Sequence, residues 1–285
     1  MGGSVASGLA AKAIASGGGL ARHQSRYSEP VGAIKPFLRE VRVEARLLPA
    51  GQFPATVPVF SRALRLSFPS AVTMFVGENG SGKSTLLETI AFHCGFDLEG
   101  GNRNHRVRQL SVTEELLQEP PPLATATKLS WSPKITQGFF LRAESFFNFA
   151  SYIDRLAEDD PRAFARYGGR SLHAQSHGES FLSLFENMFE NGIYLLDEPE
   201  AALSPQRQLA FLTILHDLAS SGRAQFIIAT HSPIILAYPG ARIYSFDGGQ
   251  IAPIAYQDTE HYRVTKGFLD APERYFRHLF NLDQS

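Results

Sequence analysis

The pattern of apolar and polar positions divides the chain into alternating strands and helices. Apolar and charged residues alternate over residues 37–48 and 63–68, which predicts two half-exposed strands. Short apolar runs predict buried strands at residues 71–76, 192–196 and 225–229. Three further short strands are predicted at residues 128–131, 138–142 and 242–246.

Helices are predicted between these strands, at residues 83–92, 145–156, 179–190 and 205–220. The tail is expected to hold two helical segments, and Asp270 with Glu273 forms a capping box that would start the second. Because strands and helices alternate, we expect an α/β fold whose mostly parallel sheet is covered on both faces.

Two stretches depart from this alternation. Residues 1–36 are rich in Gly, Ala and Ser and almost free of acids, which favours a disordered tail or an upstream start over a targeting peptide. Residues 97–127 are polar and predict a surface excursion. Its arginines, Arg103, Arg106 and Arg108, could contact a phosphate backbone, but a solvated loop is favoured.

Composition narrows the class of protein. The 285 residues are 44% hydrophobic and 19% charged, which excludes global disorder and allows one large domain or two small ones. With 27 basic and 28 acidic residues, bulk charge does not favour nucleic-acid or membrane binding. The single cysteine, Cys94, cannot form an internal disulfide, so a cytoplasmic location is expected. No apolar run is long enough to span a bilayer.

A glycine-rich segment between a predicted strand and a predicted helix matches G-x-x-x-x-G-K-[ST]. Glycines there let successive backbone N–H groups face a phosphate, and the helix N-terminus adds its dipole. Lys83 would neutralise the β- and γ-phosphates, and Ser84 would bind Mg²⁺. The predicted nucleotide site comprises Gly77, Glu78, Asn79, Gly80, Ser81, Gly82, Lys83, Ser84 and Thr85.

Polar residues follow two other predicted strands. Asp197 and Glu198 end the run at residues 192–196, and His231 follows the next strand. Neighbouring strand residues point in opposite directions, so Asp197 is expected to hold Mg²⁺ through water while Glu198 activates the attacking water. His231 would donate to the γ-phosphate and sense it. The other eight histidines show no metal-ligand spacing and are expected to be structural or on the surface.

With these motifs the chain resembles the ABC-type ATPase superfamily over about residues 37–250. Residues 175–179 read Gln-Ser-His-Gly-Glu where the family has its LSGGQ signature loop. By this resemblance Ser176, Gly178 and Glu179 would cap ATP bound by the other subunit, which implies a head-to-tail homodimer. Glu144 stands in place of the family's Q-loop glutamine and would contact Mg²⁺.

The resemblance also implies the domain layout. We expect a P-loop fold with a mostly parallel central sheet, a small N-terminal antiparallel sheet and a helical arm at about residues 144–190. The ATPase domain would occupy residues 37–255, between the tail at 1–36 and a helical extension at 256–285.

The branch of the family is suggested by Glu198-Pro199-Glu200, because transporter subunits usually continue from the catalytic Glu with Pro-Thr. The segment looks like the RecF/OLD-like, non-transporter AAA family ATPases. Lys83 and Ser176 are too close in sequence for the long coiled-coil arms of SMC-type proteins. The residues after 250 are too few for the nuclease domain of an OLD protein, so a stand-alone ATPase is expected.

The expected function is Mg²⁺-dependent ATP binding and hydrolysis that closes and opens the dimer, in a soluble switch acting on nucleic acid or a partner protein. Two alternatives stay open: the ATP-binding subunit of a membrane transporter with a permease partner, and a nucleotide sensor with low turnover. Stimulation of hydrolysis by DNA would favour the first, co-purification with membranes the second, and absence of phosphate release the third.

Overall fold

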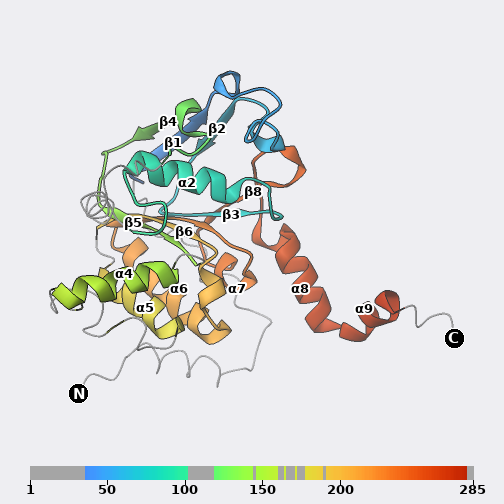
Figure 1. Cartoon of the computed structure of the whole chain (residues 1–285). Helices are drawn as coiled ribbons and strands as arrows, with labels where there is room; N and C mark the ends of the chain where they lie inside the picture. The colour runs from blue at the N-terminus through green and yellow to red at the C-terminus, as the bar shows by residue number, and fades with distance from the viewer. Residues whose placement is uncertain are drawn as a thin grey trace, which may run out of the picture.

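The computed structural model describes residues 36–101, 119–143, 146–159, 164, 171, 177–188 and 191–280. Two sheets and several helices form layers (Figure 1). A small sheet lies above helix α2 (Lys83–Cys94), a large sheet lies below α2, and further helices cover the other face of the large sheet. Of the predicted tail at residues 1–36, only Pro36 is described.

The large sheet confirms the predicted mostly parallel architecture. Its strand order is β5-β6-β7-β3-β8-β9, and only β9 runs antiparallel to its neighbour. The strands are β3 (Val72–Val76), β5 (Gly138–Arg142), β6 (Gly192–Asp197), β7 (Ala224–Ala229), β8 (Arg242–Ser245) and β9 (Ala252–Pro253). Ala229 of β7 pairs with Asp197 of β6 and with Phe75 of β3. Three central strands therefore end side by side at one edge.

The small antiparallel sheet also forms as expected, in the order β2-β1-β4. It contains β1 (Leu38–Val43), β2 (Leu64–Ser67) and β4 (Thr127–Trp131). The strand predicted over residues 37–48 is wrong beyond Val43, because both neighbouring strands stop pairing there and Ala45–Leu47 turns into the 3₁₀ helix η1. The alternation of apolar and charged residues continues in the sequence beyond Val43, but β2 and β4 offer no hydrogen-bonding partners there.

Two helices occur where the pattern placed them but with shifted ends, α4 (Phe146–Asp159) and α5 (His177–Met188), and α6 (Pro205–Ser220) has the predicted ends. The short α7 (Pro233–Leu236) was not predicted. Short 3₁₀ helices connect the elements: η2 (Pro58–Phe60), η3 (Ala124–Ala126), η5 (Pro199–Ala202), η6 (Asp247–Gly249) and η7 (Tyr256–Asp258). No helix in the described part of the chain is both long and apolar enough to cross a bilayer.

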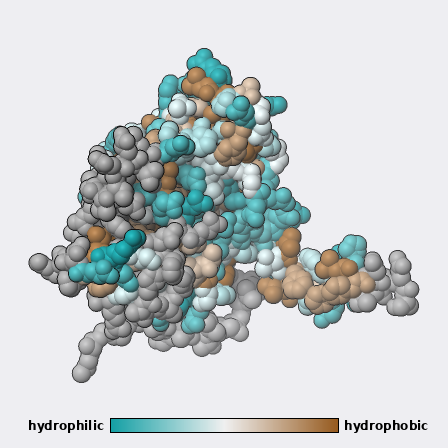
Figure 2. Space-filling view, in the orientation of Figure 1, coloured by the Kyte–Doolittle hydropathy of each residue, from teal (hydrophilic) through white to brown (hydrophobic). Residues whose placement is uncertain are grey.

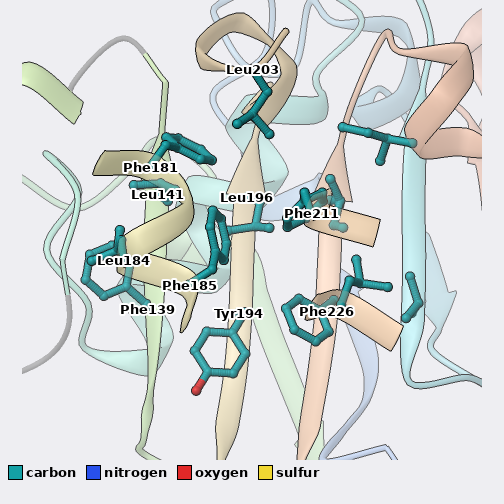
Figure 3. Packing of buried hydrophobic residues seen from close by; sticks show 14 of the residues in the cluster. Phe139, Leu141, Phe181, Leu184, Phe185, Tyr194, Leu196, Leu203, Phe211 and Phe226 are labelled. Carbon is teal, nitrogen blue, oxygen red and sulfur yellow. The ribbon is translucent and has the colours of Figure 1, made fainter. Parts of the chain in front are cut away.

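The core lies on both faces of the large sheet because its strand residues alternate between them. On one face Phe75, Leu195 and Ile227 pack against α2. On the other, Figure 3 shows Phe181 and Phe185 of α5 packed over Leu196 of β6, with Phe211 of α6 beside them. The described helices within residues 144–190, predicted as an arm, thus pack directly on the sheet.

The polar stretch at residues 97–127 is not a surface excursion at its ends. Asp97 is fully buried, and Leu123, Ala124 and Ala126 return to the core beside α2. The prediction missed these ends because the segment as a whole is polar and only a few apolar residues stand at each end. Residues 102–118, which include Arg103, Arg106 and Arg108, lie outside the described part of the chain.

Two helices follow the sheet, α8 (Glu260–Asp270) and α9 (Pro272–Leu279), and they extend away from the body (Figure 1). Neither helix buries a residue, and Figure 2 shows apolar surface over them. The predicted capping box is wrong, because Asp270 ends α8 and forms an ion pair with Lys266. Pro272 occupies the first helical position, so α9 begins after Ala271 without a side-chain cap.

Candidate functional site

The glycine-rich loop between β3 and α2 packs tightly on its surroundings. Gly77, Gly80 and Gly82 all have positive φ angles, of 142°, 78° and 103°. A Cβ on Gly82 would lie 2.7 Å from the ring of Phe60, and one on Gly77 would lie 3.0 Å from Asp247 Oδ1. Only glycine fits at these two positions, so the loop has the cradle shape that phosphate binding requires.

Lys83 begins α2 and its side chain is buried in the loop. Its Nζ donates to the carbonyl oxygens of Gly77, at 2.6 Å, and Glu78, at 2.9 Å. Burial lowers the pKa of Lys83, while the carboxylates of Glu198 and Asp197 oppose that shift. An ammonium group held only by neutral carbonyls would gain from an anion, since charge-assisted hydrogen bonds are the stronger kind.

A buried hydroxyl in the same loop, Ser81 Oγ, has no hydrogen-bond partner among the described residues. A buried hydroxyl of this kind calls for an explanation, and a phosphate oxygen in the cradle would satisfy it. Asn79, at the tip of the loop, is exposed, and Thr85 lies in the first turn of α2.

Ser84 and Asp197 meet across the gap between α2 and β6. Ser84 Oγ donates to Asp197 Oδ1 at 3.1 Å, and Asp197 is only 6% exposed. Burial raises the pKa of Asp197 to about 6, although Ser84 and the more distant Arg142 favour the charged form. The guanidinium Nε of Arg142 lies 3.8 Å from Oδ2 and so compensates the carboxylate only in part.

These two oxygen donors fit a Mg²⁺ ion. Mg²⁺ prefers hard oxygen ligands and keeps several from water and phosphate. In the described ranges no three His, Cys, Asp or Glu side chains cluster to hold a metal by themselves. Ser84 and Asp197 would therefore share the ion with a bound nucleotide. Glu144, the third predicted ligand, lies outside the described residues.

Glu198 follows Asp197 in an unusual backbone conformation. Its φ of 51° is the one positive value outside glycine in the described chain, and it turns the chain from β6 into η5. Its carboxylate is 42% exposed, and Oε1 lies 3.4 Å from Nε2 of His231. Asp197 and Glu198 do have different partners, as expected. The two side chains diverge because the chain turns at Glu198, not because neighbouring residues of a strand point in opposite directions. A strained non-glycine residue costs of order 1–3 kcal/mol and is common at functional sites.

Glu200 is a site residue that the sequence did not single out for a role. Its carboxylate accepts from Thr230 Oγ1 at 2.8 Å and from the backbone N–H of His231 at 2.5 Å. Burial raises the pKa of Glu200, and these hydrogen bonds oppose that shift. Glu200 thereby ties the turn after β6 to the turn after β7. In the sequence, Glu200 stood out only because transporter subunits usually have Thr after the Glu-Pro pair.

Asp247 supports the loop from the other side. Its Oδ1 accepts from the backbone N–H of Glu78 at 3.0 Å, and its Oδ2 accepts from Ser245 Oγ at 2.9 Å. The link joins residues far apart in sequence, and nothing near Asp247 resembles a motif. The carboxylate fixes the first turn of the cradle.

His231 and His261 form a direct contact that the sequence did not predict. Nδ1 of His231 lies 2.7 Å from Nε2 of His261, the second residue of α8. Both rings border a cavity of about 530 Å³ beside the tip of the glycine-rich loop. Its other lining residues are Glu78, Asn79, Glu260, Val264 and Thr265.

The segment predicted as a signature loop is only partly described. Ser176 lies outside the described residues, and Gly178 falls in the first turn of α5. Glu179 is exposed, and its carboxylate lies 3.4 Å from the guanidinium of Arg207 in α6.

Two family models match parts of the chain. The model described as "AAA domain, putative AbiEii toxin, Type IV TA system" matches residues 172–237. The model described as "AAA domain" matches residues 58–129. The first range contains the acids after β6 and His231, and the second contains the glycine-rich loop.

Curated relatives are ATP-binding proteins of import systems. The iron(3+)-hydroxamate import ATP-binding protein FhuC of Bacillus subtilis is 24% identical over 184 residues, 59% of this chain and 66% of the relative. The cobalamin import ATP-binding protein BtuD of Halobacterium salinarum is 28% identical over 167 residues, 55% of this chain and 41% of the relative. Both alignments span less than two thirds of the relative's length.

Solved structures are also similar. The cbiO1 protein of Clostridium perfringens, described as part of the ABC transporter complex cbiONQ, has a TM-score of 0.49 and 17% identity, covering 87% of this chain and 100% of that one. The SMC head domain from Thermotoga maritima has a TM-score of 0.42 and 18% identity, covering 77% of this chain and 99% of that one.

The loop and the acids of the sheet edge are thus matched by two separate domain models, and ATP-binding proteins align with more than half of the chain. These matches support the P-loop ABC-type ATPase superfamily for this chain and indicate an ATP-hydrolysing P-loop enzyme.

Proposed function

We propose that this protein binds ATP with Mg²⁺ in the loop at residues 77–85 and hydrolyses it at the adjoining sheet edge. The observation that carries the proposal is the convergence of Lys83, Asp197, Glu198 and His231 on that edge, from three different elements. Each side chain has the chemistry that hydrolysis of a γ-phosphate needs.

The roles follow from the contacts. Lys83 exchanges its carbonyl acceptors for phosphate oxygens and neutralises their charge. Glu198, which is more exposed than Asp197, orients the attacking water and accepts its proton. His231 turns its Nε2 toward the γ-phosphate. Ser84 and Asp197 would hold Mg²⁺, which when bound would supply Lewis-acid stabilisation of the developing phosphate charge.

We further propose that ATP closes a head-to-tail homodimer. A second copy would present Ser176, Gly178 and Glu179 at the N-terminus of α5 to the nucleotide, and a helix N-terminus is suited to an anion. ATP would favour the closed state because its phosphates gain contacts from both copies only there. Hydrolysis removes those contacts and opens the dimer.

The favoured biological role is a cytoplasmic ATPase switch acting on nucleic acid or a partner protein. The Glu-Pro-Glu sequence at residues 198–200 and the match to a model named for a toxin–antitoxin system support it. In this proposal the chain comprises a tail at residues 1–36, an ATPase domain at 37–255 and a helical extension at 256–285. The ATPase domain would belong to the RecF/OLD-like branch.

A transporter subunit is the second candidate, favoured by the relatives named for import. The experiment that separates the two measures ATP turnover alone, with duplex DNA, with single-stranded DNA and with membranes. Stimulation by DNA supports the switch, and stimulation by membranes that carry a permease supports the transporter. Absence of phosphate release under every condition contradicts the proposed hydrolysis.

A further inference from the structure

The contact between His231 and His261 links the nucleotide site to the C-terminal helices. His231 follows β7, and its backbone N–H is bound by Glu200, so its position is set by the sheet edge. His261 comes from α8, and the two rings lie with their centroids 4.8 Å apart. At 2.7 Å between Nδ1 and Nε2, the two imidazoles share one hydrogen bond.

The first turn of α8 is fixed in place beside His231, although the rest of the helix is exposed. Thr259 is fully buried, and its Oγ1 accepts from the backbone N–H of Tyr262 at 3.3 Å. The Tyr256 hydroxyl donates to the carbonyl of Pro233 at 2.9 Å, two residues after His231. The buried Thr259 cap and the Tyr256 hydroxyl, both of which precede His261, thus hold the start of α8 beside His231.

The proton in this hydrogen bond decides what the other nitrogen of His231 can do. A neutral imidazole carries one proton, so one ring nitrogen donates and the other accepts. If His231 donated from Nδ1, its Nε2 would present a lone pair to Glu198 Oε1, 3.4 Å away, and two acceptors would face each other. If His261 donates, His231 keeps its proton on Nε2, which then faces the carboxylate favourably.

We propose that His261 is a positioning residue that donates to Nδ1 of His231 and so holds the Nε2–H tautomer of His231 toward the γ-phosphate. The inference rests on the proposed function, in which His231 contacts that phosphate. Nε2 of His231 is buried and, apart from the longer contact with Glu198 Oε1 at 3.4 Å, lacks a hydrogen-bond partner among the described residues, so it can still donate to a ligand.

The surroundings favour the neutral form of both rings, as this arrangement requires. Burial lowers the pKa of His231 and of His261, and the nearby Lys83 adds to both shifts. Glu198 opposes the shift at His231, while Asp247 and Glu260 oppose it at His261. Among the described residues, the charged groups around the pair are Lys83, Glu198, Asp247 and Glu260, with Glu78 lining the same cavity and Glu200 bound to the backbone N–H of His231.

The first test reads the tautomer directly, without nucleotide. Two-bond ¹H–¹⁵N NMR spectra of the histidine-labelled full chain distinguish Nε2–H from Nδ1–H, and the His231→Ala spectrum assigns the signal. We expect mainly Nε2–H in the wild type and in His278→Ala, a control on an exposed histidine of α9. His261→Phe keeps a ring but removes the donor to Nδ1, so the share of Nδ1–H should rise, although Glu198 Oε1 still favours Nε2–H. An unchanged tautomer in His261→Phe, or mainly Nδ1–H in the wild type, overturns the proposal.

The second test measures ATP turnover. His261→Phe should lower kcat about fivefold to tenfold, the loss of one hydrogen bond, with KM changed less than about twofold. His261→Gln places an amide N–H near the Nε2 position and should restore most of kcat. In a His231→Ala background, His261→Phe should have no further effect. An equal loss of kcat in both backgrounds would mean that His261 does not act through His231. Inactivity of the wild type with the expected tautomers would instead fault the proposed hydrolysis.

Discussion

The edge of the large sheet and the C-terminal helices contribute to the same site in opposite ways. At the edge, Asp197 ends β6 and His231 follows β7, and both strands are buried along their whole length, so packing on both faces of the sheet fixes the two residues. In α8 and α9 no residue is buried, yet His261 reaches the site from the first turn. Burial on both faces of the sheet holds Asp197 and His231 in place, whereas one anchored turn of α8 is enough to bring His261 into contact with His231.

The comparison predicts that substitutions at the sheet edge change activity or stability more than substitutions of the same residue type in α8 or α9. The first prediction concerns Lys83. Lys83→Ala should abolish ATP binding, because no other described ammonium group lies in the cradle. Wild type at ~100 times Kd should gain about 2.7 kcal/mol of stability from Mg-ATP, and Lys83→Ala none. Thermal-shift titration measures both.

Lys266→Ala is the matched control, because Lys266 is exposed and pairs only with Asp270 within α8. It should bind ATP like the wild type. A thermal shift that survives in Lys83→Ala would place the nucleotide elsewhere.

The second prediction compares two phenylalanines. Phe185 is 1% exposed between α5 and the sheet, whereas Phe276 of α9 is 38% exposed. Phe185→Ala should lower the free energy of unfolding by about 3–5 kcal/mol, and Phe276→Ala by less than about 1 kcal/mol. Urea denaturation of both variants gives the difference. Equal losses would mean that the C-terminal helices are part of the core.

The third prediction concerns Glu198. Glu198→Gln keeps the shape of the side chain but removes the base, so kcat should fall by about 10²–10³-fold while ATP still binds. The variant should accumulate a dimer with ATP on a sizing column. Glu273→Gln, on an exposed acid of α9, should change neither property. A Glu198→Gln variant with normal turnover would remove Glu198 from the mechanism.

The fourth prediction is a pH dependence. The pKa of Asp197 is raised from 3.8 to about 6 in the folded state, so the fold binds that proton more tightly than the unfolded chain does. Without metal, stability should therefore fall as pH rises from about 4 to about 6, by up to about 3 kcal/mol. Asp197→Asn should flatten this part of the curve, and Asp270→Asn should leave it unchanged. A curve that is equally steep in Asp197→Asn would assign the effect to another group.

The same contrast explains what could be predicted from the sequence. The strands, most helices and the glycine-rich loop were predictable because their signals are local: apolar runs, spacing of glycines and the acids that follow a strand. Glu200, Asp247 and His261 escaped because each acts on a residue in another element, across distances in sequence that no motif spans. The end of β1 was missed for a similar reason, since it depends on where the neighbouring strands stop pairing.

The most direct test is a crystal structure of the protein with Mg²⁺ and a non-hydrolysable ATP analogue. We expect the triphosphate in the loop at residues 77–85, with Nζ of Lys83 moved from the carbonyls of Gly77 and Glu78 onto phosphate oxygens. Ser84 and Asp197 should share the metal ion. A nucleotide bound at any other place, with the bonds from Lys83 to those two carbonyls intact, would contradict the account.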